Sequence, residues 1–161
     1  MHQALGILAF FFLTSLGAQS GVHRLQDARS QAMGGTTVMN EGSFALMGNP
    51  AGLVHAQQWQ GIASAEAPFA LWELQRTGFG VLAPLANSSV GATIATFGEK
   101  SYQETQISLA YSRLLNQQLS LGATLVYWNQ NVAAYQRQGF LTFSLGIQAQ
   151  LHPELKAGVQ L

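Results

Sequence analysis

The fold is decided by residues 140–151, FLTFSLGIQAQL, where large apolar side chains alternate with small or polar ones. Successive side chains of a β-strand point to opposite faces, so this pattern predicts a strand with one apolar face and one small or polar face. The same alternation recurs at 105–114 and 119–130. The expected strands cover residues 57–69, 77–85, 89–97, 105–114, 119–130 and 139–151, and a seventh begins at Leu155.

The lengths and connections of these strands distinguish two classes of β-protein. Strands of soluble proteins usually run ~5–6 residues, whereas a strand that crosses a bilayer needs about 9–11. Short turns are expected at 86–88, 116–117 and 152–154, and longer connections at 73–77, 98–103 and 131–138. Short turns at one end and long loops at the other are typical of outer-membrane barrels. The sequence therefore predicts an all-β fold, an antiparallel up-and-down transmembrane β-barrel, with a soluble β-sandwich as the alternative.

Aromatic residues near the strand ends support the barrel. Membrane barrels carry a girdle of aromatic side chains at each membrane boundary. Near the longer connections lie Trp72, Tyr102, Tyr127, Trp128 and Tyr135, and near the short turns lie Trp59 and Tyr111. Two girdles are therefore expected.

The composition of the 161-residue chain excludes several functions. Only 9% of the residues are charged, against about 25% in soluble domains. Seven Lys and Arg balance seven Asp and Glu without a basic cluster, which excludes nucleic acid as a partner. The absence of cysteine from the sequence excludes disulfides and thiolate chemistry.

Residues 1–20 are expected to be a signal peptide. The uncharged stretch ALGILAFFFLTSLGA is short for a membrane span, and Ala18 and Ser20 place small residues at a cleavage site after Ser20. The usual basic start of such a peptide is missing, and a buried helix is the alternative. No other stretch is apolar enough for a membrane helix, so an exported membrane protein would cross with strands. The expected location is the outer membrane, with lipid as a partner.

Seven strands raise the question of closure. Bacterial single-chain barrels have an even number of strands, from about eight upward. An open edge in lipid would leave backbone groups unpaired. The chain is therefore expected to be part of a longer barrel; the alternatives are an eight-stranded barrel with one unrecognised strand, or pairing with another chain.

Residues 21–56 precede the strands of 57–161 and contain two helix signals. Residues 26–40 begin like a helix that stops at Gly34 and Gly35. In GNPAGL, residues 48–53, Asn49 is a good N-cap and Pro50 suits the first helical position, so a short helical turn is expected there. The segment is either a surface lead-in to the first strand or a plug folded into the barrel lumen.

The sequences DARSQAMGG, residues 27–35, and FALMGNPAGL, residues 44–53, together resemble the N-terminal signature of the PorV/PorQ family of outer-membrane proteins. The NPAGL element also resembles the N-terminal hatch of FadL-type transporters of hydrophobic compounds. The resemblance implies a hatch motif made of Gly34, Gly35, Asn49, Pro50, Ala51 and Gly52. It also implies a Bacteroidota-type barrel of about fourteen strands, of which this chain supplies the first half.

The function implied by this resemblance is that of an accessory to type IX protein secretion or surface attachment. Its partners would be secreted proteins or components of the secretion machinery. The alternative is a FadL-like channel for small hydrophobic molecules, in which the segment around Asn49 and Pro50 is part of a movable plug.

The sequence does not predict an enzyme, a cofactor or a metal site. Beyond residue 20 the only Asp is Asp27, the Glu residues are scattered, and the His residues have no partner at metal-binding spacing. No nucleophile elbow or phosphate-binding loop is present in the sequence. Glu66 lies in the first expected strand beside Pro68, which cannot donate a ladder hydrogen bond, so a kink or lateral gap is expected there.

Overall fold

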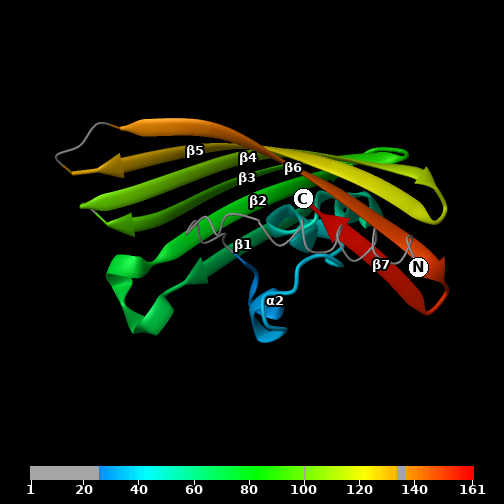
Figure 1. The fold of residues 1–161 in the computed structure, drawn as a ribbon, viewed down its shortest axis with the longest axis horizontal. Coiled ribbons are helices and arrows are strands. Elements are labelled where there is room, and N and C mark those ends of the chain that lie inside the picture. Colours follow the sequence, from blue (N-terminus) through cyan, green and yellow to red (C-terminus); the bar gives the residue numbers. More distant parts are fainter. Residues whose placement is uncertain (1–25, 100, 134–136) are drawn as a thin grey trace, which may run out of the picture.

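The chain forms one curled antiparallel sheet, seen edge-on in Figure 1. The computed structural model describes residues 26–99, 101–133 and 137–161, so the expected signal peptide lies outside the described residues. Each strand pairs with the next along the chain, which confirms an all-β, antiparallel, up-and-down sheet. The strands are β1 Gln60–Glu66, β2 Arg76–Pro84, β3 Ser88–Glu99, β4 Tyr102–Asn116, β5 Leu119–Val132, β6 Gln138–His152 and β7 Leu155–Gln160.

The first strand is shorter than the expected 57–69. It pairs in regular register with β2 from Gln60 to Glu66 and then ends, because Pro68 opens the 3₁₀ turn η4, Pro68–Ala70. A second 3₁₀ turn, η5, covers Trp72–Leu74 before β2 begins. The feature expected as a bend inside a paired strand is therefore the end of that strand.

The expected long connection at 98–103 is a tight turn. Glu99 of β3 pairs directly with Tyr102 of β4, so only residues 100–101 lie between the strands. Gly98 accommodates the turn with a φ of 90°, a conformation that a side chain disfavours. Of the three connections expected to be long, those between β1 and β2 and between β5 and β6 are therefore longer than a tight turn, and the one between β3 and β4 is not.

The two faces of the sheet differ in chemistry as the alternation predicts. The convex face carries large exposed apolar side chains, among them Leu109, Leu125 and Phe143. The concave face carries small or polar residues such as Ser108 and Ser112. Trp128, expected in an aromatic girdle, lies on the concave face instead, where it is buried and stacks on Phe140, because its even position places it opposite Tyr127.

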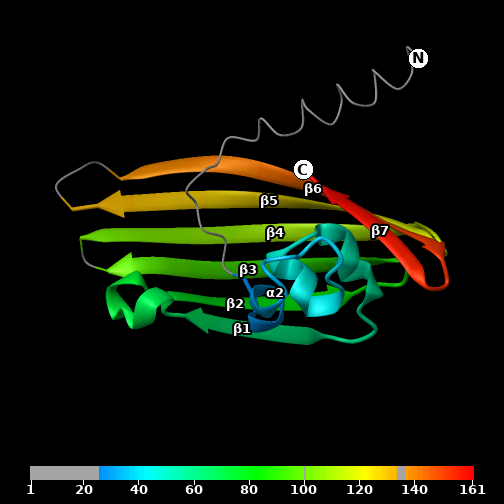
Figure 2. The same cartoon turned by 60° about the horizontal axis from the view of Figure 1, so that its bottom comes forward.

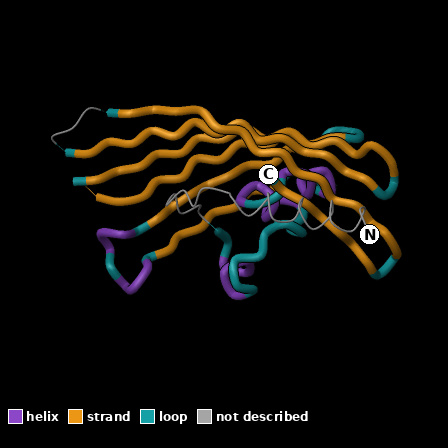
Figure 3. The backbone as a smooth tube through the Cα atoms, in the orientation of Figure 1, coloured by secondary structure: helices purple, strands orange, loops and turns teal. Residues whose placement is uncertain are grey.

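The segment of residues 26–56, called here the N-terminal segment, lies against the concave face (Figures 2 and 3). It contains the helix α2, Ala28–Ala32, and two 3₁₀ helices, η2, Gly42–Met47, and η3, Pro50–His55. Leu46 and Leu53 pack with Ile62, Leu82 and Ala110 of the sheet to form the hydrophobic core. Within the described residues, no helix is both long and apolar enough to cross a membrane.

Candidate functional site

The centre of the contact between the N-terminal segment and the sheet is Asn49, which is fully buried. Its Oδ1 accepts a hydrogen bond from the Ala51 amide at 3.0 Å, which is the N-cap expected from the sequence. Its Nδ2 donates to the carbonyl oxygens of Val38 at 2.9 Å, Ile147 at 3.2 Å and Val159 at 3.3 Å. Asn49 therefore caps η3 and also joins the segment to β6 and β7.

Pro50, Ala51 and Gly52 continue this contact. Pro50 occupies the first turn of η3, and the Ala51 carbonyl accepts a hydrogen bond from Ser112 Oγ of β4 at 3.1 Å. A Cβ at Gly52 would overlap the carbonyl of Asn40 in the neighbouring turn. The glycine is therefore needed for close packing inside the segment itself.

Glycines of the sheet form a matching socket. A Cβ at Gly122 would overlap the backbone of Pro50 and Ala51, and one at Gly146 would overlap Asn49 Oδ1. Gly91 of β3 and Gly158 of β7 make similarly close approaches to Leu46 and to Met39. The sequence predicts small residues on this face of the sheet. It does not predict that the N-terminal segment packs against them.

Amide side chains of β6 and β7 add further hydrogen bonds to the segment. Gln148 Nε2 donates to the carbonyls of Val38 at 2.8 Å and Asn40 at 3.1 Å. Gln160 Nε2 donates to the Gly48 carbonyl at 3.1 Å. These contacts could not be predicted from the sequence, because they join residues more than a hundred positions apart.

The other edge of the sheet is joined to the segment as well. The Ser43 amide donates to Gln60 Oε1 of β1 at 2.7 Å, and Ser64 Oγ of β1 donates to the Gln26 carbonyl at 2.9 Å. An exposed ion pair between Lys156 Nζ and Glu41 Oε1, 2.5 Å apart, lies at the β7 edge. The segment therefore contacts both edge strands.

The two glycines of the proposed hatch motif lie apart from this contact. Gly34 and Gly35 have φ values of 73° and 81° and follow α2 as its predicted stop. A Cβ at Gly34 would have no neighbour within 4 Å, and Gly35 lies next to Gln26. Their role is thus in the turn after α2, while Asn49 to Gly52 form the contact with the sheet.

A buried polar cluster holds α2 to the rest of the segment. Asp27 caps α2 by accepting hydrogen bonds from the Ser30 amide at 3.0 Å and from Ser30 Oγ at 2.6 Å. Asn40 Nδ2 donates to Ser30 Oγ at 2.8 Å. All three residues are buried, so this cluster fixes the internal shape of the segment.

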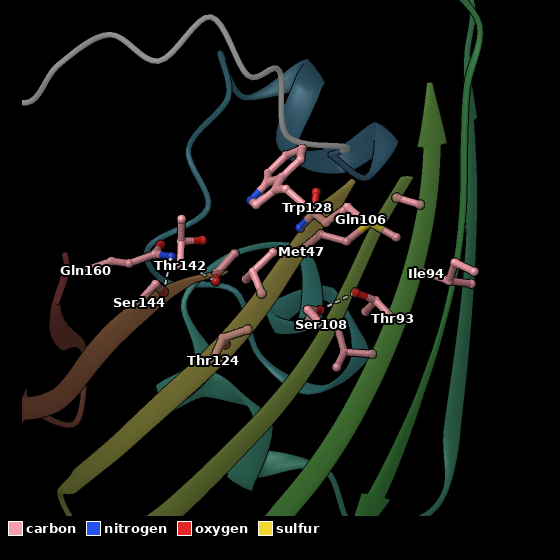
Figure 4. Close-up of a pocket in the computed structure, with 14 residues that line it drawn as sticks. Met47, Thr93, Ile94, Gln106, Ser108, Thr124, Trp128, Thr142, Ser144 and Gln160 are labelled. Carbon is pink, nitrogen blue, oxygen red and sulfur yellow. Dashed lines mark hydrogen bonds between the residues drawn. The ribbon is translucent and has the colours of Figure 1, made fainter. Parts of the chain in front are cut away.

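A cavity of about 60 Å³ lies beside η2, on the concave face (Figure 4). Its lining includes Leu46, Met47 and Trp128. The hydroxyls of Thr93 and Ser108 are hydrogen-bonded to each other on the wall. The remaining polar lining residues are Gln106, Thr124, Thr142, Ser144 and Gln160.

Charged residues gather on the concave face beyond this cavity. Arg76 is buried, lies 3.6 Å from a Glu66 carboxylate oxygen and places its guanidinium 4.7 Å from the centre of the Phe97 ring. Glu66 is therefore paired with Arg76 across β1 and β2. Pro68 lies outside this pair, beyond the strand end.

Within residues 26–99, 101–133 and 137–161, no cluster of three or more His, Asp or Glu side chains is arranged to hold a metal ion. The site is thus a network of amide, hydroxyl and backbone groups between a helical segment and a sheet. Such groups can bind and position a polypeptide or a small molecule. Comparison with models of protein families, with curated proteins and with solved structures finds no match to this chain.

Proposed function

We propose that this chain forms part of the wall of an outer-membrane β-barrel, with the N-terminal segment folded inside it as a hatch. The observation that carries the proposal is the convex face of the sheet. Leu109, Leu125 and Phe143 are 61%, 51% and 76% exposed and lie on three successive strands. Water-soluble monomers rarely expose a continuous apolar surface of this kind, whereas a lipid-facing wall requires it.

The border of this apolar surface supports the proposal. One row of paired residues across the convex face is apolar throughout and consists of Phe79, Ile94, Ile107, Tyr127 and Leu141. The next row towards the β1–β2 connection is polar and consists of Thr77, Thr96, Thr105 and Asn129. A band of apolar residues that ends at a polar row is typical of a barrel surface at the membrane boundary.

The directions of the two edge strands are compatible with a closed barrel. Within the described residues, β1 pairs only with β2, and β7 only with β6. Since all neighbours are antiparallel, β1 and β7 run in the same direction. Antiparallel closure then needs an odd number of further strands, which gives the even total of bacterial barrels.

For the activity of this barrel, we infer an accessory role in type IX protein secretion or surface attachment. The support is the resemblance of residues 27–53 to the PorV/PorQ signature, together with an apolar surface on the β1–β2 connection. Phe69 and Trp72 are 89% and 73% exposed there, and Leu71 between them is exposed as well. These side chains lie on the far side of the polar row from the proposed lipid-facing band. They therefore offer an apolar surface to a secreted polypeptide outside that band.

A channel for small hydrophobic molecules is the second candidate. The observation that favours it is the cavity beside η2, because Met47, Leu46 and Trp128 give a small molecule an apolar surface inside the curled sheet. The polar lining residues would orient it.

The membrane location is tested with two lysine substitutions on the same strand. Leu109→Lys places a charge in the middle of the apolar band, and Thr105→Lys places it in the polar row. In a membrane wall, Leu109→Lys should reduce the folded outer-membrane fraction strongly and Thr105→Lys only slightly, as read by fractionation and heat-dependent gel migration. Equal amounts of both variants in a soluble periplasmic fraction would contradict the proposal.

The two activities are separated by what remains bound after purification in mild detergent. Co-purified secreted proteins that are lost in Phe69→Ser and Trp72→Ser support the secretion role. Lipid-like molecules that are lost in Met47→Ser support the channel. The matched control for both is Asn129→Ala, a half-buried residue away from the connection and the cavity.

A further inference from the structure

We infer that the N-terminal segment is a fixed cross-brace that joins the two edges of the sheet and sets its curvature, rather than a plug that moves as a gate. This inference goes beyond the proposed function, because it depends only on contacts within the chain. It applies to the curled sheet whether the barrel carries proteins or small molecules.

The first support is the position of the contacts along the sheet. At one edge, Gln60 and Ser64 of β1 hold the segment through Ser43 and Gln26. At the other edge, Gln160 of β7 holds it through Gly48. The segment therefore spans the concave side of the curl from the first strand to the seventh, as Figure 2 shows.

The middle of the span is attached as well. Ser112 of β4 donates to the Ala51 carbonyl at 3.1 Å, and Gln148 of β6 donates to Val38 and Asn40. A flat or more open sheet would separate β1 from β7 and break the contacts at one end. The ladder between neighbouring strands does not prevent such flattening, since sheet twist and curl vary widely.

The second support is the shape of the contact. Gly122 lets the backbone of Pro50 and Ala51 approach closer than a side chain would allow, and Gly146 does the same for the side chain of Asn49. Such a fit has one position, because sliding η3 along the wall would bring it against larger side chains. Moving it away would remove the two carbonyl acceptors that the sheet offers the buried amide of Asn49, those of Ile147 and Val159.

The brace is tested by measuring the distance between the two sheet edges in the purified full chain in mild detergent. The sequence contains no cysteine, so Ala65→Cys in β1 and Ala157→Cys in β7 give a single pair of spin labels at exposed positions. A brace predicts one narrow distance distribution. Combining Asn49→Ala with Gln160→Ala should broaden it about twofold or more, while Asn129→Ala should leave it unchanged.

An unchanged distribution in a folded double variant would overturn the brace. A second label pair keeps the test decisive where the double variant does not fold. Labels at Phe44→Cys in η2 and Ala157→Cys in β7 report the position of the segment in the otherwise native chain, since Phe44 is exposed. One distance supports a brace, and two separate distances identify a moving gate. Equal amounts of the Leu109→Lys and Thr105→Lys variants in a soluble periplasmic fraction would contradict the membrane location but would leave these distances unaffected, so the two proposals fail separately.

Discussion

Asn49 shows how one side chain can serve two structural purposes with its two amide atoms. Its oxygen caps η3, and its nitrogen donates to carbonyls of the segment, β6 and β7. In an exposed cap, Asp is as good as Asn. At this position Asp would place a buried negative oxygen against those carbonyls.

Asn49→Asp should therefore lower the free energy of unfolding by about 1–3 kcal/mol or more, despite preserving the cap. Urea unfolding followed by tryptophan fluorescence measures this loss. Asn129→Asp is the matched control: Asn129 is only partly buried and accepts a hydrogen bond from Arg137 at 2.6 Å, so a negative charge there should be neutral or slightly stabilising. Equal stability of Asn49→Asp and the unaltered protein would mean that the cap is the whole role of Asn49.

Gly146 leads to a second prediction about a single residue. A Cβ there would overlap Asn49 Oδ1, so Gly146→Ala should destabilise the protein by about 1–3 kcal/mol through overpacking. Gly61→Ala is the control, because the nearest atom to its Cβ would be 3.9 Å away. Comparison of the two urea midpoints tests the socket, and matching midpoints would argue against it.

Among the elements, the β1–β2 connection contains the backbone strain. Phe69 and Ala70 both have a φ of 57°, a left-handed conformation that costs a residue with a side chain about 1–2 kcal/mol. Ala70→Gly should relieve this cost and raise the urea midpoint. Ala63→Gly inside β1 should lower stability by roughly 0.5–1 kcal/mol, since glycine weakens a strand. A lower midpoint for Ala70→Gly would show that its methyl group contributes more than the strain costs.

The elements follow from the sequence to the extent that local patterns determine them. Side-chain alternation predicts β4, β5 and β6 well, because one apolar face per strand determines which residues point outwards. Local patterns do not predict the shorter β1 or the tight β3–β4 turn. Polar residues at 98–103 are typical of a loop, whereas cross-strand pairing of Glu99 with Tyr102 continues the ladder to its end.

The candidate site is less visible in the sequence. The cap at Asn49 and the stop at Gly34 and Gly35 are local signals and could be predicted. The acceptors of the Asn49 amide on Ile147 and Val159 could not, because backbone carbonyls carry no sequence signal. The alternation shows the socket glycines as small residues, but it does not show that residues 49–51 pack against them.

Across the whole molecule, strands with two neighbouring strands should have backbone amides that are better protected from hydrogen exchange than strands with one neighbour. Residues in the middle of β4 and β5 have partners on both sides, while β1 and β7 each pair on one side within the described residues. Hydrogen exchange in mild detergent should therefore be slowest in β4 and β5 and faster along the outer edges of β1 and β7. Membrane insertion with closure should slow exchange at those edges. Edge amides that exchange equally fast in the membrane would contradict a closed barrel.

The contacts of Asn49 also bear on how the protein folds. Ile147 and Val159 follow it by 98 and 110 positions, whereas each hairpin joins neighbouring stretches of chain. Contacts between residues far apart in sequence form slowly, because a long loop must close first. The N-terminal segment is made first yet can complete its docking only once β6 and β7 are paired. The segment is therefore synthesised before the strands but docks after them. Its docking completes only when β6 and β7 are paired in the correct register.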